Sequence, residues 1–227
     1  MWGMTVRNWQ ELLRDPSLTV LLVLQLCAVF LVTPLAALGL PLTRAVGETL
    51  VLAVVVIVVM LSHRRGAIVV IVLGIAAILA SFLLGPEWPP AAASVLGRGG
   101  ALLTFSALTW VVAHAVYAPG PITSQRIQGA FVLYLNVGEI FASAYRLIWE
   151  LSPAAFAHLH PPARSPGEIA AMLYFSFSTL TTVGYGDIVP VNPLARGLAN
   201  LEAVIGQLYL VTTIARLVTL ELEGRRR

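Results

Sequence analysis

The chain has 227 residues, of which 58% are hydrophobic and 11% are charged, and its formal net charge is +3. This charged fraction is about half of that in soluble globular domains, so the composition is typical of an integral membrane protein. All 14 basic residues are arginines, and no basic stretch is dense enough to suggest a nucleic-acid partner. The single cysteine, Cys27, lies in an apolar run without clustered metal ligands.

Apolar runs long enough for membrane helices follow one another along the chain. A hydrocarbon core of about 30 Å needs roughly 20 helical residues. We expect six spanning helices, at about 18–40, 49–62, 67–84, 101–118, 127–151 and 193–220. A shorter apolar stretch at 169–180 is too short to span by itself. The predicted fold class is therefore an all-α integral membrane protein with six transmembrane helices and one re-entrant helix.

The arginines orient these helices, because short arginine-rich loops stay on the cytoplasmic side of a membrane. With the N-terminus inside, eight arginines face the cytoplasm: Arg7, Arg14, Arg64, Arg65, Arg126, Arg225, Arg226 and Arg227. Three face outward: Arg44, Arg98 and Arg164. Both termini are therefore expected in the cytoplasm. The first apolar run lacks a small-residue cleavage pattern and is expected to be a spanning helix, not a removed signal peptide.

The stretch before the short apolar run predicts a helix start. Ser165 stands three residues before Glu168, and Pro166 follows the serine directly, which is a capping box with proline at the first helical position. A helix from Pro166 to about Leu180 would be about 22 Å long, so it has to enter the membrane and return. The returning backbone at Thr181–Asp187 then has to be covered by protein or line water.

The returning segment reads TTVGYGD and resembles the selectivity filter of the potassium channel family. The resemblance implies that the carbonyl groups of Thr182, Val183, Gly184 and Tyr185, together with the Thr182 hydroxyl, replace the water around K⁺ ions. It also implies a homotetramer with the pore on its axis and no other cofactor. Gly184 and Gly186 adopt positive φ at little cost, so alternating backbone handedness can turn successive carbonyls to one side.

The same resemblance assigns supporting roles around the filter. Tyr174 and Phe175 occupy positions of an aromatic collar that would receive Tyr185, or else they are ordinary packing aromatics. Asp187 would accept hydrogen bonds behind the filter mouth or present negative potential to cations. Thr181 and Ser178 complete this set of supporting residues. Ser178 stands where several relatives carry a glutamate, and a serine is unable to form a carboxyl pair with Asp187.

Charged and small residues in the last two spans are further candidates. Glu202 is an ionisable group in a membrane helix, and we expect it to pair with Arg146, within one chain or between subunits, because Arg146 lies at a similar depth on the preceding span. Gly206 lies 19 residues after Asp187, a spacing that resembles the position of a hinge glycine in related channels. The resemblance implies a gating hinge, and close helix packing by a small residue is the alternative. The role of Glu139 is open, although it could face one of the first helices.

Residues 1–118 are expected to form a four-helix region, and residues 119–227 a pore module. The fourth span contains His114 but no arginine series, so this region is not expected to sense voltage. Only a short tail follows Leu220, so ligand gating would need an unidentified regulatory subunit. Arg64 and Arg65 could bind anionic membrane lipids, although a plain topology signal explains them as well.

The sequence therefore favours a potassium-selective channel of the bacterial plasma membrane, with a weakly selective monovalent cation channel as the alternative. The letters GYGD also fit intramembrane aspartyl proteases, which need two carboxylates. The only other aspartate, Asp15, is predicted at the opposite membrane face from Asp187, so no enzyme is expected. A transporter with four pore repeats and a purely structural subunit were the remaining alternatives, and neither explains a single filter motif.

Overall fold

A computed structural model describes residues 19–40, 65–83, 88–117, 124–159, 161 and 165–225. The described residues are mostly helical. The elements in chain order are a helix at Thr19–Ala37, which contains η1 (Ala28–Val32) and α2 (Thr33–Ala37), then α4 (Arg65–Leu83), α5 (Pro90–Val116), α6 (Ser124–Leu151), β1 (Phe156–Ala157), α7 (Pro166–Leu180), β2 (Val189–Pro190) and α8 (Pro193–Arg225). The two short strands pair antiparallel, with Phe156 opposite Pro190 and Ala157 opposite Val189.

The length and apolar character of the helices indicate a multi-pass membrane protein. Within the described ranges, four helices are long and apolar enough to cross a membrane: Thr19–Ala37, Ala91–His114, Arg126–Leu151 and Pro193–Arg216. The apolar part of α4, Gly66–Ser81, is shorter. The predicted span at 49–62 lies outside the described residues, so the count of six spans stays a prediction.

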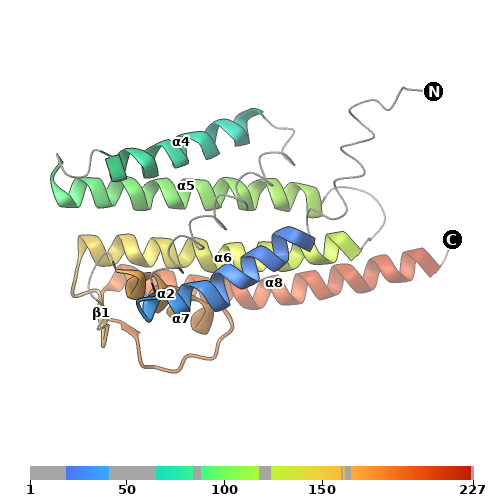
Figure 1. Cartoon of the computed structure of the whole chain (residues 1–227). Helices are drawn as coiled ribbons and strands as arrows, with labels where there is room; N and C mark the ends of the chain where they lie inside the picture. Colours follow the sequence, from blue (N-terminus) through green and yellow to red (C-terminus); the bar gives the residue numbers. More distant parts are fainter. Residues whose placement is uncertain are drawn as a thin grey trace, which may run out of the picture.

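The helices are stacked in layers (Figure 1). α4 packs on α5, α5 packs on α6, and α6 packs in turn on α7 and α8. α2, at the end of the first helix, packs against α7. α6 therefore lies between the α4–α5 pair and the short helix α7 (Figure 1).

The α4–α5 pair is held together by close backbone contact between glycines. A Cβ added to Gly100 would lie 2.6 Å from the carbonyl oxygen of Gly74, a distance that real side chains do not reach. The Thr104 hydroxyl donates to the Gly100 carbonyl at 2.8 Å at the same crossing. Small residues of this kind allow membrane helices to pack closely when no hydrophobic force between them is available.

The prediction that the fourth span begins near residue 101 was wrong. α5 begins at Pro90, with proline in its first turn, which is a favoured position for proline because the missing N–H has no helical partner there. Arg98 therefore lies inside a helix and is 6% exposed, and it does not belong to a solvated outer loop. The glycines around it, which suggested a loop, instead include the Gly100 contact with α4.

The core between α6, α7 and α8 is aromatic. The ring of Phe175 packs edge-on to Tyr145 at 4.9 Å and to Phe156 at 5.5 Å between ring centroids. The ring of Phe177 packs directly against the backbone of α6 at Gly138, where a Cβ would lie 2.7 Å from the ring. These contacts fix the short helix α7 against the long helix α6.

Candidate functional site: the re-entrant segment

The short helix begins where the capping box predicts. The Ser165 side chain accepts a hydrogen bond from the backbone N–H of Glu168 at 3.2 Å, and Pro166 is the first helical residue. The helix ends at Leu180 after 15 residues. At 1.5 Å per residue this length does not cross a hydrocarbon core, and the chain turns back into an extended segment.

The extended segment alternates in backbone handedness. Thr182 has φ of 61°, Gly184 of 57° and Gly186 of 80°, so every second residue is left-handed. The two glycines were predicted to do this. Thr182 was not predicted, because a non-glycine residue at positive φ is uncommon. Such alternation is what lets successive carbonyl groups of one strand point in the same direction.

The base of this segment is tied to the last turns of α7. The carbonyl of Ser178 accepts hydrogen bonds from the amides of Val183 at 2.9 Å and Gly184 at 3.2 Å. The amide of Thr182 donates to the carbonyl of Thr179 at 2.9 Å. Ser178 therefore contributes its main-chain oxygen to the base of this segment, whereas the sequence reasoning considered only its side chain.

Side-chain hydroxyls extend this anchoring. Thr181 donates to the carbonyl of Phe177 at 2.6 Å. The Thr182 hydroxyl accepts a hydrogen bond from the side chain of Gln207 on α8 at 3.2 Å. Gln207 was missed by the sequence reasoning, although it directly follows Gly206. It connects the long helix α8 to the start of the extended segment.

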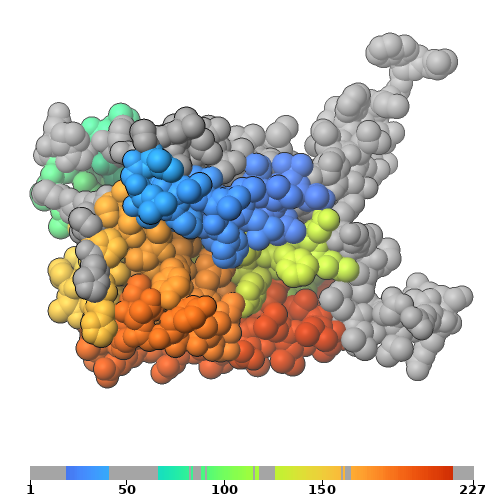
Figure 2. Space-filling view, turned by 60° about the horizontal axis from the view of Figure 1, so that its bottom comes forward, coloured from blue at the N-terminus to red at the C-terminus, as the bar shows by residue number. Residues whose placement is uncertain are grey.

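The segment lies at the surface of the single chain. Thr181–Asp187 is exposed throughout, and the side chains of Val183 and Tyr185 are 54% and 69% exposed. Figure 2 shows this orange part of the chain on the face turned forward, beside the red helix α8. On the neighbouring part of α8, large apolar side chains are exposed as well: Leu201, Val204 and Leu208.

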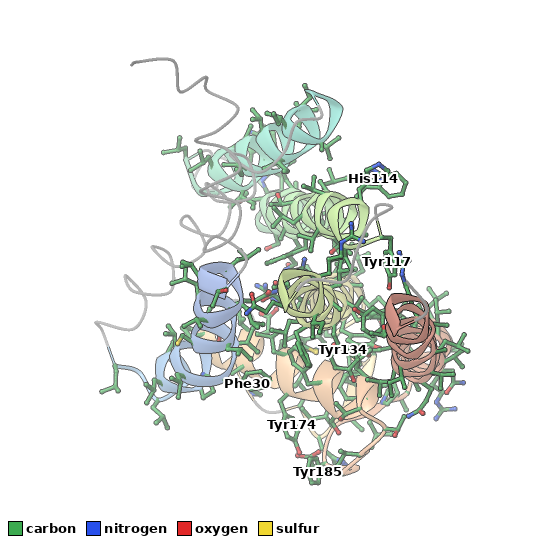
Figure 3. All side chains as sticks on the ribbon, turned by 90° about the vertical axis from the view of Figure 1, so that its right-hand side faces the viewer. Phe30, His114, Tyr117, Tyr134, Tyr174 and Tyr185 are labelled. Atoms are coloured by element: carbon green, nitrogen blue, oxygen red, sulfur yellow. The ribbon has the colours of Figure 1, made fainter. Side chains whose placement is uncertain are left out.

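Tyr174 supports the outer part of the segment. Its ring stacks on the Tyr185 ring with centroids 5.8 Å apart and planes within 12°, and both rings lie together at one edge of the molecule (Figure 3). The Tyr174 hydroxyl also interacts electrostatically with Asp187. The carboxylate of Asp187 accepts from the backbone N–H of Ile188 at 3.1 Å. Phe175, the other predicted collar residue, packs behind the helix against Tyr145 instead.

The predicted ion pair between Arg146 and Glu202 is wrong within this chain. Glu202 is fully buried, and its two oxygens accept hydrogen bonds from the hydroxyls of Ser176 and, at 2.6 Å, Tyr145. Arg146 instead donates to Glu168 at 3.1 Å. Neighbouring helix residues point about 100° apart, so Tyr145 turns toward α8 while Arg146 turns toward the start of α7.

Gly206 lies where α8 crosses the end of α7. A Cβ on this glycine would overlap the carbonyl oxygen of Leu180, which also accepts from the Tyr134 hydroxyl at 3.4 Å. Figure 3, which looks along the helices, shows Tyr134 between α6 and α8. Close packing is thus the role that the contacts give Gly206, and a hinge there stays a prediction.

Glu139 is connected to the first helix. Gln25, which is buried, interacts electrostatically with Glu139 and donates to the side-chain oxygen of Asn136 at 2.6 Å. The open question of what Glu139 faces is therefore answered by the helix at Thr19–Ala37. His114, by contrast, stacks on Trp110 of its own helix.

A buried charge cluster at the start of α7 was not predicted. Arg98 contacts Glu168 and Glu150, the second at 2.9 Å, and Arg146 contacts Glu168. Arg98 is the only arginine, lysine or carboxylate of α5. A charge inside an apolar helix is a sequence signal of function, but the predicted start near residue 101 left Arg98 outside the helix.

Comparison with known proteins places this region. A family model described as "Ion channel" matches residues 132–222, which include α7, the extended segment and most of α6 and α8. Residues 132–222 are therefore similar to the ion channel family. The ion channel family is not an enzyme class.

Two relatives resemble the channel region in part. It is 36% identical over 78 residues to the inward rectifier potassium channel Kirbac3.1 of Paramagnetospirillum magnetotacticum, covering 34% of this chain and 23% of the relative. It is 35% identical over 79 residues to the potassium voltage-gated channel protein shk-1 of Caenorhabditis elegans, covering 35% and 15%. The predicted resemblance to the potassium channel family is thereby confirmed. The chain spans less than a quarter of either relative's length.

No solved structure matches the chain significantly.

Proposed function

We propose that the protein is a potassium-selective channel of a bacterial plasma membrane, in which four copies of the chain surround one pore. The observation that carries the proposal is the alternation of left-handed residues at Thr182, Gly184 and Gly186 in an exposed segment after a short capped helix. A strand of this geometry can present a row of carbonyl oxygens to a dehydrated K⁺ ion. Both named relatives are potassium channels, which supports this choice of ion.

The exposure of the segment supports assembly around an axis. Irregular backbone at membrane depth is tolerated only when protein covers it or when it faces water. One strand offers too few oxygens to replace a hydration shell, whereas four copies offer rings of four. The C-terminal end of α7, at Leu180, would then direct its partial negative charge toward the ions.

The proposal is tested by ion flux into liposomes that contain the purified protein. We expect uptake of K⁺ to exceed that of Na⁺ strongly and to be blocked by Ba²⁺. Equal uptake of the two ions would favour the alternative, a weakly selective monovalent cation channel. Absence of uptake at every applied voltage would contradict the proposal.

Replacement of Gly184 by alanine tests the filter assignment. A side chain at φ of 57° is strained, even though no atom lies within 4 Å of the added Cβ in a single chain. We expect Gly184→Ala to abolish selective K⁺ flux. Gly66→Ala is the matched control, because Gly66 has the same open surroundings but a helical backbone in α4. Selective K⁺ flux through the Gly184→Ala variant would contradict the assignment of this segment as the filter.

A further inference from the structure

Four buried or half-buried charged residues meet where α5, α6 and α7 come together. Arg98 of α5 is 6% exposed, Glu150 of α6 is 9% exposed, and Glu168 of α7 is fully buried. Arg146 of α6 completes the group, which we call the charge cluster, through its 3.1 Å contact with Glu168. The four side chains carry two positive and two negative charges.

Arg98 is the member that reaches across a layer. α5 packs on the face of α6, and α7 packs on α6 as well. The Arg98 guanidinium nevertheless contacts Glu168 in the first turn of α7 through both terminal nitrogens. It also donates to the Glu150 carboxylate at 2.9 Å and to the carbonyl oxygen of Arg146 at 2.7 Å. A planar guanidinium with several donors suits such branched contacts.

Glu168 is placed where it controls the orientation of the short helix. Its backbone N–H is held by the Ser165 cap, and its side chain is held by Arg98 and Arg146. The opposite end of the same helix carries the Ser178 carbonyl, which binds the base of the filter segment. Because a helix of this length is stiff, a displacement of its first turn tilts its last turn and moves the filter with it.

We propose that Arg98 is a positioning residue that ties α5 to the first turn of α7, so that a shift of the α4–α5 pair reaches the filter segment through this side chain. For its effect on conduction the inference rests on the proposed potassium channel function. It assigns the first half of the chain a physical connection to the pore that does not require voltage-sensing arginines.

A purely structural role for Arg98 makes a different prediction from a positioning role. Arg98→Gln alone leaves an excess negative charge in the cluster, and an uncompensated buried charge destabilises any protein. The double variant Arg98→Gln with Glu150→Gln removes one charge of each sign and keeps the pair between Arg146 and Glu168. It therefore restores charge balance but not the connection between α5 and α7.

The experiment combines hydrogen exchange with K⁺ flux per assembled channel in liposomes. In the double variant we expect normal yield of folded protein, but exchange in residues 166–187 that is about tenfold faster, the factor expected when a charge-assisted hydrogen bond is lost. We expect reduced flux per channel in the same variant. Arg216→Gln is the matched control, since it removes an arginine that packs over Tyr117, away from the cluster.

Wild-type exchange and flux in the double variant would overturn the inference, because Arg98 would then only balance charge. If the double variant does not fold, Arg98→Lys tests the positioning role instead. Lysine keeps the positive charge but lacks the planar guanidinium that contacts several partners at once. Faster exchange in residues 166–187 of Arg98→Lys would support positioning, and wild-type exchange would overturn it. If the wild-type protein does not conduct, the proposed function fails. The exchange measurement still tests whether Arg98 positions α7.

Discussion

The α4–α5 pair and the region of α6, α7 and α8 are held together by different contacts. In the first, backbones touch at Gly74 and Gly100, and the bond from Thr104 to the Gly100 carbonyl stays within α5. In the second, buried polar side chains bridge helices, as Glu202 does with Ser176 and Tyr145. The comparison teaches that the buried polar bridges between helices gather around the short helix α7, where Arg98 of α5 also reaches Glu168. The crossing of α4 and α5 at Gly74 and Gly100 depends on close backbone approach instead.

The largest effect is expected from removing the buried carboxyl group of Glu202. Glu202→Ala leaves the Tyr145 hydroxyl without this acceptor and opens a cavity, so we expect a loss of about 2 to 5 kcal/mol in unfolding free energy. Glu202→Gln offers a carbonyl to Tyr145 and an amide to the Ser176 oxygen, and should retain most of the stability. Thermal unfolding in detergent measures both variants, and equal losses would show that the hydrogen bonds contribute nothing.

An intermediate effect is expected when a methyl group is forced into each kind of helix contact. Gly206→Ala would strike the Leu180 carbonyl, and Gly100→Ala would strike the Gly74 carbonyl. Overpacking of this kind costs about 1 to 3 kcal/mol at either site. Only Gly206→Ala should also change K⁺ flux per folded channel, because Leu180 ends the helix below the filter.

The control for both glycine variants is Gly197→Ala, whose added methyl group meets no atom within 4 Å in the chain. It should cost no unfolding free energy. Equal changes of K⁺ flux in Gly100→Ala and Gly206→Ala would contradict the claim that only the contact at Gly206 affects conduction. Unchanged stability with altered gating in Gly206→Ala would instead favour the hinge.

The smallest effect is expected at the outer part of the filter segment. Tyr174→Phe removes the hydroxyl that interacts with Asp187 but keeps the ring that stacks on Tyr185. One hydrogen bond is worth about 0.5 to 1.5 kcal/mol, so we expect a permeability ratio of K⁺ to Na⁺ that falls by less than about tenfold. Tyr174→Leu, which also removes the stack, should lower the ratio further. Identical ratios in the two variants would show that stacking does not support the segment.

Local sequence rules predicted the part of the site that depends on neighbouring residues. The capping box at Ser165 and Glu168 fixed the start of α7, and the glycine positions predicted left-handed backbone at Gly184 and Gly186. Both features are set within a few residues of chain. The left-handed Thr182 escaped prediction, because residue type alone argues against that conformation.

The contacts between helices were predicted less well. Counting residues along two spans placed Arg146 and Glu202 at similar depth, but depth leaves helix rotation undetermined. Tyr145, one position earlier, faces Glu202 instead. Arg98 was placed in a loop because its glycine-rich surroundings were interpreted as a turn, whereas Gly100 serves close packing against α4.

The central claim is tested most directly by the reversal potential of the purified protein in a bilayer with K⁺ on one side and Na⁺ on the other. If carbonyl oxygens of the segment at Thr182–Tyr185 select the ion, current reverses close to the equilibrium potential of K⁺. A reversal potential near zero, with robust current, would contradict potassium selectivity.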